Sequence, residues 1–424
     1  LPLRSHTQLS KDNNIMILVQ NDNTQPFWYD KIKAPHQKER MRMSETAKRS
    51  DWNTPQGYHP NKPEILNAAQ NAIENDIIGK TRTVKAAYGG KYIDGVPVLQ
   101  WGEWKDNTYC GCIAAAMELM GQPVGYSMVM GATGLCFRFG MSEDWDPGVS
   151  LAQQGPLATD DSGLSAALGI AMNWTSDPKE RERRLRQEID AGRPVLCLGQ
   201  NGPPEWGLLL GYTANGEIFG RSYFDQQERG QHPDGVCEYT QNHYLKAYTY
   251  PGFVPEYFVR FIDKACTTTD AKEVLKNSLL FCTSSFDTTW EKFKIGEGAY
   301  RIFIRGMQLD NDDYRKHCGN DQYFLGGLLD AGRAAQQYLR DSAALLTGEN
   351  RQQLISISAW YEKMNREILR VIPYEKTTAI FSQSSAPIWD RALRLRLAGV
   401  LQENLECEKK IRAAVKTILK HWAD

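Results

Sequence analysis

The chain has 424 residues, of which 41% are hydrophobic, so it can bury a sizeable core and form two or three domains. Its 50 basic and 51 acidic residues leave a formal charge of −1. A balance this even indicates no nucleic-acid partner and no attraction to an anionic membrane. No apolar run approaches the length of about eighteen residues typical of a membrane span, and the start of the sequence does not resemble a signal peptide. The first residue is Leu1 rather than Met, which leaves open whether a segment precedes it.

The nine cysteines are odd in number and widely scattered, from Cys110 to Cys407. Small secreted scaffolds have densely spaced, even sets of cysteines instead. The pattern therefore predicts reduced thiols and a cytoplasmic location.

The first part of the chain is polar and then becomes structured. Residues 1–60 are rich in Asn, Gln, Lys and Pro and predict a partly ordered arm, with a strand only over 15–19. Apolar residues at helical spacing predict a short helix over 63–78. Residues 91–101 predict two short strands around an Asp-Gly turn.

Cys110 lies where a polar loop passes into an Ala- and Met-rich helix that ends at Gly121. The first amide groups of a helix and the positive end of its dipole favour the thiolate, which is the nucleophilic form of cysteine. A second interpretation is also open at this point. Free cysteines are usually small buried apolar residues, and Cys110 and Cys112 fit that description as well.

The Gly- and aromatic-rich segment 126–140 is charged only at Arg138. It lacks the glycine spacing of a nucleotide-binding loop, so we expect a tightly packed loop beside a cleft and no cofactor. Beyond it, helices give way to an antiparallel sheet. Helices are predicted over 161–173, 178–191 and 271–281, and strands over 193–199, 206–224 (a hairpin turning at Asn215-Gly216), 253–262 and 299–304.

The last hundred residues show helical periodicity almost throughout. Three helices are predicted, over 321–346, 350–372 and 386–422, with short polar breaks between them. An antiparallel three-helix bundle is the simplest arrangement. The bundle contains no Glu-x-x-His pattern, so we expect no metal, and a homo-oligomer would use the bundle as its interface.

Three segments follow one another in an informative order: the Cys-Gly helix start at Cys110, a Gly-Arg-Pro-Val strand near 193–199, and the hairpin that begins at Trp206 and leads to Asp225. This order resembles papain-like thiol hydrolases of the bacteriocin-processing type and the amino-terminal domain of butirosin-type acyltransferases. The resemblance covers about residues 95–265. It implies an α+β domain over 61–310, with helices packed on an antiparallel sheet, followed by a helical bundle domain over 311–424.

The resemblance also implies the roles of particular residues. Cys110 takes the position of the nucleophile, and Asp225 that of the acid that orients the general base. The base itself is a His in those families, whereas this chain has Glu205 there. Asn107, or alternatively Gln100, takes the place of the side chain that helps to bind the oxyanion.

The carboxylate of Glu205 is the main departure from the family. A carboxylate near a thiol raises the pKa of the thiol above its usual value of about 8.5, so the carboxylate does not activate the thiol. Three alternatives remain open: His232 or His243 reaches the site, Glu205 itself acts as an acid or base, or the fold has lost its chemistry. Trp206 and Arg138 are further candidates for substrate contact.

Two functions follow from these residues. The first is a papain-like thiol acyltransferase or amide hydrolase acting on a small molecule or peptide, with Cys110 as nucleophile and Glu205 and Asp225 positioning the acceptor. The second is a catalytically inactive papain-like protein that binds a small molecule or peptide. The sequence does not identify the substrate, the acyl donor or the oligomeric state.

Overall fold

The computed structural model describes residues 84–87, 89–96, 98–146, 162–175, 177–199, 205–225, 236–237, 244–246, 259–264, 269–316, 320–377 and 389–422. All of them belong to one compact unit, Trp52–Asp424. The predicted arm 1–60, with its strand over 15–19, and the predicted helix over 63–78 lie outside the described residues.

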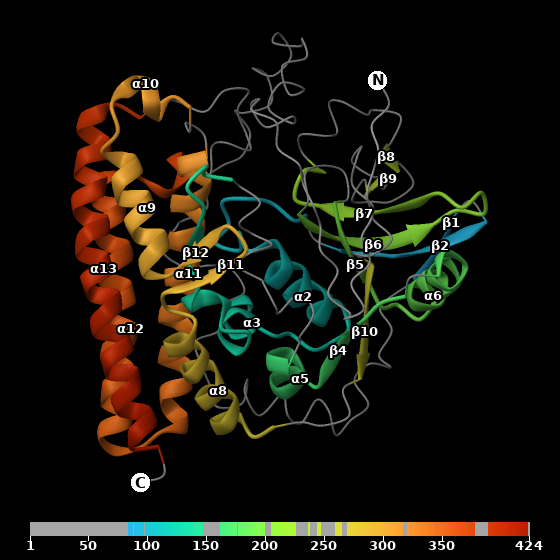
Figure 1. The fold of residues 1–424 in the computed structure, drawn as a ribbon. Helices are drawn as coiled ribbons and strands as arrows, with labels where there is room; N and C mark the ends of the chain where they lie inside the picture. Colours follow the sequence, from blue (N-terminus) through green and yellow to red (C-terminus); the bar gives the residue numbers. More distant parts are fainter. Residues whose placement is uncertain are drawn as a thin grey trace, which may run out of the picture. The chain divides into compact units, whose positions relative to one another are not determined.

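Nine of the described strands form one antiparallel sheet (Figure 1). Its order is β4 (Ile170–Asn173), β10 (Val259–Lys264), β5 (Val195–Leu198), β6 (Trp206–Tyr212), β7 (Ile218–Ser222), β9 (Tyr244–Lys246) and β8 (Val236–Cys237), while β2 (Gly90–Ile93) pairs with β6 and with β1 (Val84–Ala87). A second sheet contains β11 (Thr288–Trp290), β12 (Phe293–Ile295) and β3 (Gly140–Met141).

β6 is the centre of the large sheet. It pairs with β5 in the register Leu198↔Trp206 and with β7 in the register Gly207↔Ser222. The β6–β7 hairpin turns at Gly216, whose φ of +83° is a conformation that glycine adopts readily. The hairpin predicted at Asn215-Gly216 is therefore confirmed.

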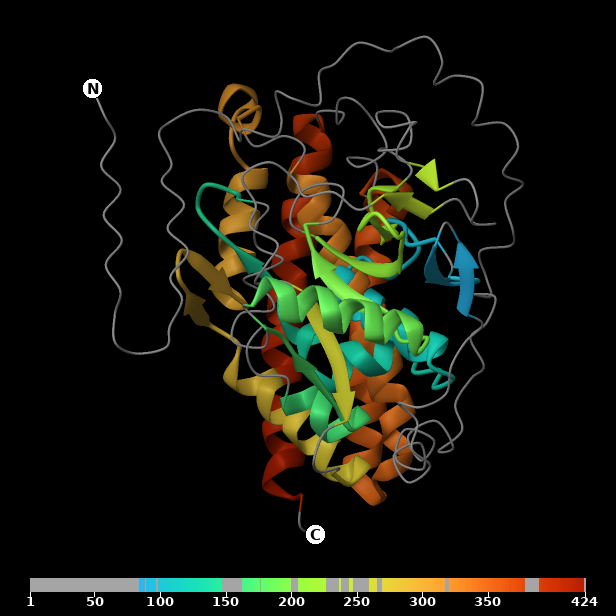
Figure 2. The same ribbon diagram turned by 90° about the vertical axis from the view of Figure 1, so that its right-hand side faces the viewer.

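Helices cover both faces of the sheet. α2 (Thr108–Leu119) packs against β5 and β6 on one face. α6 (Pro178–Asp190) crosses the other face, which is turned towards the viewer in Figure 2. All seven residues of β6 are buried, as expected for a strand covered on both sides.

Four sequence predictions require correction. Residues 126–132 form a helix, α3 (Tyr126–Ala132), rather than a loop. The predicted helix over 161–173 divides into α5 (Ser162–Leu168) and β4. Residues 299–304 belong to α9 (Glu297–Met307), and of the two strands predicted over 91–101 only the first, β2, is present among the described residues.

The differences at α3 and at α9 have physical causes. Gly131 made α3 look like a loop, but a Cβ there would lie 2.0 Å from the ring of Tyr338, so glycine allows α3 to approach α11 closely. Residues 299–304 look apolar enough for a strand. Arg301 and Arg305 are exposed one turn apart on an otherwise buried helix, which is the periodicity of α9.

The carboxy-terminal part is helical, as predicted. It contains α11 (Asn320–Ser342), α12 (Gly348–Val371) and α13 (Arg391–Lys420), with the short helices α10 (Asn311–Tyr314), η8 (Ala343–Leu345) and η9 (Tyr374–Lys376). Two helices from earlier in the chain pack against them: η4 (Leu135–Phe137) on α11 and α8 (Ala271–Ser284) on α13. α13 packs along α8, α9 and α12, and α11 packs on α3. No helix among the described residues is long and apolar enough to cross a membrane.

The hydrophobic core joins the sheet domain and the bundle. One continuous cluster contains Ile113 of α2 and Leu208 of β6 together with Tyr338, Leu354 and Ile411 of the bundle. The domain boundary at residue 310 remains a prediction, since sharing a core does not by itself show whether either part folds alone.

Candidate active site at the head of α2

Cys110 lies in the first turn of α2, as predicted. Asn107 is the N-cap residue, and its side-chain oxygen accepts a hydrogen bond from the Cys110 amide at 3.1 Å. Such a cap satisfies one of the amide groups that a helix start leaves without a partner. The Cys110 amide and the side-chain oxygen of Asn107 are therefore bound to each other, so neither is free for an oxyanion.

The thiol of Cys110 is sealed inside the protein. The residue is 0% exposed, and its Sγ lies 4.0 Å from Oγ1 of Thr133. Burial raises the thiol pKa far above its ordinary value, and the nearby Asp330 raises it further, while the contact with Thr133 lowers it. Cys110 is therefore a neutral thiol at neutral pH, despite its position at a helix start.

Glu205 binds the same turn of α2, but at Thr108 rather than at Cys110. Oγ1 of Thr108 donates to Glu205 at 2.6 Å and accepts a hydrogen bond from the Trp206 amide at 3.2 Å. The hydroxyl of Tyr323, from α11, donates to the other carboxylate oxygen at 3.2 Å. Burial raises the pKa of the Cys112 thiol, and Glu205 is the first charged group that raises it further. The charge of Glu205 therefore opposes ionisation of the Cys112 thiol instead of activating it.

Asp225 binds residues at the end of β7, the strand that directly precedes it. It accepts a hydrogen bond from the Ser222 amide at 2.8 Å and pairs with Arg221 at 3.6 Å, with both side chains 1% exposed. Arg221 in turn donates to the carbonyl of Val96. A buried ion pair of this kind fixes the end of β7 to the segment after β2.

The other predicted contact residues occupy different environments. Gln100 donates to Glu103 at 2.8 Å near the surface. Trp206 is 2% exposed, and its ring lies 5.0 Å from that of Tyr109 in the core. Arg138 is buried with its guanidinium 5.8 Å from the ring of Phe281, and burial lowers its pKa to about 10. The structure thus brings Cys110, Asn107, Glu205 and Trp206 to one end of α2.

A group of polar residues at this end of α2 was not predicted. Tyr126 donates to Asp330 at 2.5 Å and accepts from the Asn107 amide at 3.0 Å. Tyr374 donates to Asp106 at 2.5 Å. These contacts connect the head of α2 to α3, α11 and η9.

Both carboxyl groups of this cluster hold their protons more tightly than usual. Burial and, after it, the charge of Asp106 raise the pKa of Asp330 to about 8, although the hydrogen bond from Tyr126 lowers it. Burial likewise raises the pKa of Asp106 to about 6. One signal in the sequence indicates that Asp330 is a candidate site residue, because it is an acidic residue within the apolar face of a predicted helix. Acidic side chains are rarely buried without a partner or a role.

Among the described residues, no group of three His, Cys, Asp or Glu side chains is placed to hold a metal ion. His232 and His243 lie outside the described residues. No family model matches the chain, and no curated protein matches it either.

Proposed function

We propose that the chain is a catalytically silent protein of papain-like fold that binds a small molecule or peptide. The observation that carries this proposal is the complete burial of the Cys110 thiol beside Thr133. A thiol attacks a carbonyl as the thiolate, and only where the substrate can reach it. Cys110 meets neither condition.

The remaining polar contacts support the same conclusion. Asn107 already binds the Cys110 amide, so no oxyanion can use that amide without breaking the helix cap. Glu205 opposes ionisation of Cys112 and is held by Thr108 and Tyr323. The residues that would form a thiol site instead fasten α2 to β6 and α11.

Two aromatic rings beside Glu205 offer a binding surface. Trp101 and Tyr323 are both partly exposed, with ring centroids 6.4 Å apart in an edge-on arrangement. Glu205 lies beside them, bound to Tyr323. Glu205 itself is buried, at 9% exposure, so a ligand on the two rings would meet the charge of its carboxylate rather than an exposed surface. Aromatic rings next to a carboxylate favour a ligand group that is positively charged.

Alkylation of the intact protein tests the loss of thiol chemistry. We expect iodoacetamide to leave Cys110 unmodified between pH 6 and pH 8, and to modify it once urea unfolds the chain. Mass spectrometry after digestion identifies the labelled cysteines. Cys407, which is only partly buried, is the internal control for reagent activity. Rapid labelling of Cys110 alone below pH 7 would show that the thiol is activated and would overturn the proposal.

Substitution of Glu205 tests the binding surface. We expect agmatine, a small molecule with an amine and a guanidinium, to change the tryptophan fluorescence of the wild type in a saturable way. Glu205→Gln removes the charge and should weaken this binding by about tenfold, corresponding to about 1.4 kcal/mol. Glu217→Gln, at the opposite end of β6, is the control and should bind as the wild type does. Equal affinity in both variants would place the ligand elsewhere.

A further inference from the structure

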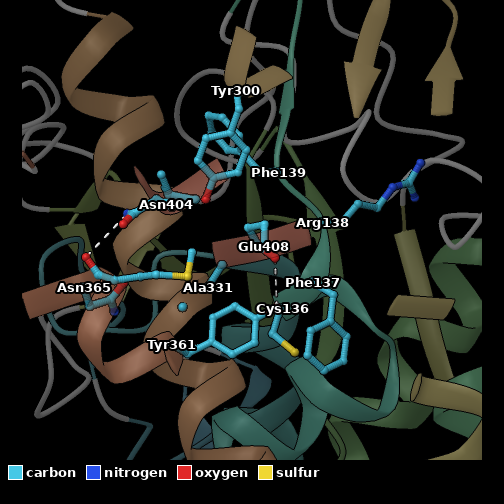
Figure 3. A pocket seen from close by; sticks show the side chains of 13 residues that line it. Cys136, Phe137, Arg138, Phe139, Tyr300, Ala331, Tyr361, Asn365, Asn404 and Glu408 are labelled. Carbon is cyan, nitrogen blue, oxygen red and sulfur yellow. Dashed lines mark hydrogen bonds between the residues drawn. The ribbon is translucent and has the colours of Figure 1, made fainter. Parts of the chain in front are cut away.

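A cavity lies among the carboxy-terminal helices and residues 136–139 (Figure 3). Side chains of α9, α11, α12 and α13 line it. Its volume is about 20 Å³ for a water-sized group, within about 330 Å³ of empty space that is partly open to solvent. A cavity needs roughly 10–15 Å³ of such volume to hold one water molecule, so the enclosed part accepts only about one or two heavy atoms, and the rest of a ligand must lie in the part open to solvent.

Tyr300 directs an unused hydroxyl into this cavity. The residue is 1% exposed, and its hydroxyl has no hydrogen-bond partner in the part of the chain that the structure describes. The ring is fixed edge-on against Phe139, with centroids 5.2 Å apart. Figure 3 shows the hydroxyl pointing towards Asn404 and Glu408. Buried hydroxyl groups nearly always have a partner, so this one indicates a missing ligand atom.

The two asparagines of the cavity provide acceptors. Asn365 donates through its amide nitrogen to the carbonyl of Leu329 at 2.7 Å, and Asn404 donates to the carbonyl of Met364 at 3.4 Å. These contacts fix the amide nitrogens. The side-chain oxygens of Asn365 and Asn404 therefore remain as hydrogen-bond acceptors for a ligand.

The charged groups at the cavity are either paired or directed away from it: Arg138 lines it, but Figure 3 shows its guanidinium pointing away from Tyr300 and Asn404. Glu408 forms a buried ion pair with Arg412, one turn further along α13, and accepts a hydrogen bond from Tyr361 at 3.4 Å. Arg412 also donates to the carbonyl of Phe137 at 3.0 Å. A charge on the ligand would therefore find no counter-charge in this buried place, which favours a neutral ligand.

We propose that this cavity binds a small neutral molecule, or a small neutral group of a larger one, that carries a carboxamide. The carbonyl oxygen of the ligand accepts from Tyr300, and its N–H groups donate to the oxygens of Asn365 and Asn404. Apolar walls from Phe139 and Leu328 enclose the rest. The site uses neither Cys110 nor Glu205, so it stands independently of the function proposed above.

Acetamide is the probe for this site, observed by saturation-transfer difference NMR with the full chain. We expect saturable binding to the wild type in the millimolar range. Tyr300→Phe should weaken it at least fivefold, and Ala331→Leu, which fills the cavity from α11, should abolish it. Tyr212→Phe removes a hydroxyl from β6 that binds Asp190, far along the chain from the cavity, and should leave binding unchanged.

The stability of Tyr300→Phe gives a second readout. Removing a hydroxyl without a partner should leave the melting temperature without ligand unchanged or raised, because no hydrogen bond is lost. Loss of binding with retained stability supports the site. Absence of saturable binding to the wild type, or wild-type affinity in Tyr300→Phe, overturns it. If Tyr300→Phe does not fold, Ala331→Leu decides, since retained affinity there would equally overturn the proposal.

Discussion

Asp330 shows how strongly one buried side chain can link stability to pH. Its carboxyl is 2% exposed and bound by Tyr126 in the middle of α11. Its pKa in the folded protein is raised to about 8, above the value of about 4 in an unfolded chain. The folded state therefore binds more protons than the unfolded state between these two values, and its stability falls as the pH rises through this window.

Asp330→Asn should remove most of that pH dependence. For one group the slope is at most about 1.4 kcal/mol per pH unit, so the wild type should lose a few kcal/mol of unfolding free energy between pH 5 and pH 8. The variant should show a much flatter curve and be the more stable protein at pH 8. Urea unfolding at several pH values measures this, with Asp94→Asn as the control. Parallel curves for Asp330→Asn and the wild type would mean that Asp330 is ionised in the folded protein.

The residues of the predicted site differ in how well the sequence could locate them. Cys110 at the start of a helix and Trp206 at the start of a strand follow from local patterns of capping and hydrophobic periodicity. The partners of Glu205 do not, because Thr108 and Tyr323 are 97 and 118 positions away along the chain. The sequence of the Cys110 segment is compatible with a reactive thiol and with a buried apolar residue. Only the packing of Thr133 and α11 decides between these two alternatives.

At the scale of elements, α2 and the end of β7 approach each other unusually closely. A Cβ on Gly111 would lie 2.0 Å from the hydroxyl of Tyr223, which donates to the carbonyl of Lys105 at 2.8 Å. The Cys-Gly pair that resembles a catalytic motif thus has a structural explanation. Glycine at position 111 lets Tyr223 fasten the loop before α2 to the sheet.

Gly111→Ala should destabilise the protein by about 1–3 kcal/mol, because Tyr223 must leave its position and its hydrogen bond. Gly399→Ala is a matched control in α13, where a Cβ would meet no atom within 4 Å. That change should stabilise the chain by up to about 1 kcal/mol through helix propensity. Thermal unfolding followed by circular dichroism compares the two. A neutral Gly111→Ala would show that the contact with Tyr223 is not required for folding.

The errors at the element scale also have particular causes. α3 differs from the predicted loop because its sequence is shaped by what packs on it, and α9 contains a glycine of the same kind outside the predicted strand over 299–304. Gly131 accommodates Tyr338, and a Cβ on Gly306 would lie 1.9 Å from the ring of Trp145. Local propensity disfavours glycine in helices, and tertiary packing overrides it at both positions. Long amphipathic helices such as α12 and α13 were predictable because their periodicity extends over many turns.

At the scale of the whole unit, the carboxy-terminal helices share their apolar surfaces with the rest of the chain. α13 packs on α8 and α9, and Tyr338 of α11 packs on Gly131 of α3. Ile411 and Leu354 belong to the same cluster as Leu208 of the sheet. Helical propensity alone stabilises isolated helices only marginally in water, so these helices depend on the partners that cover their apolar faces.

A fragment of residues 311–424 tests the predicted boundary against this shared core. We expect partial helicity by circular dichroism and a broad, non-cooperative thermal transition, because the fragment lacks α3, α8 and α9. A longer fragment, 269–424, restores α8 and α9 and should melt more cooperatively and at a higher temperature. The comparison is informative because both fragments contain the complete helices α11, α12 and α13. If 311–424 already shows full helicity and a sharp transition, the bundle closes on itself and the boundary at 310 is a true domain boundary.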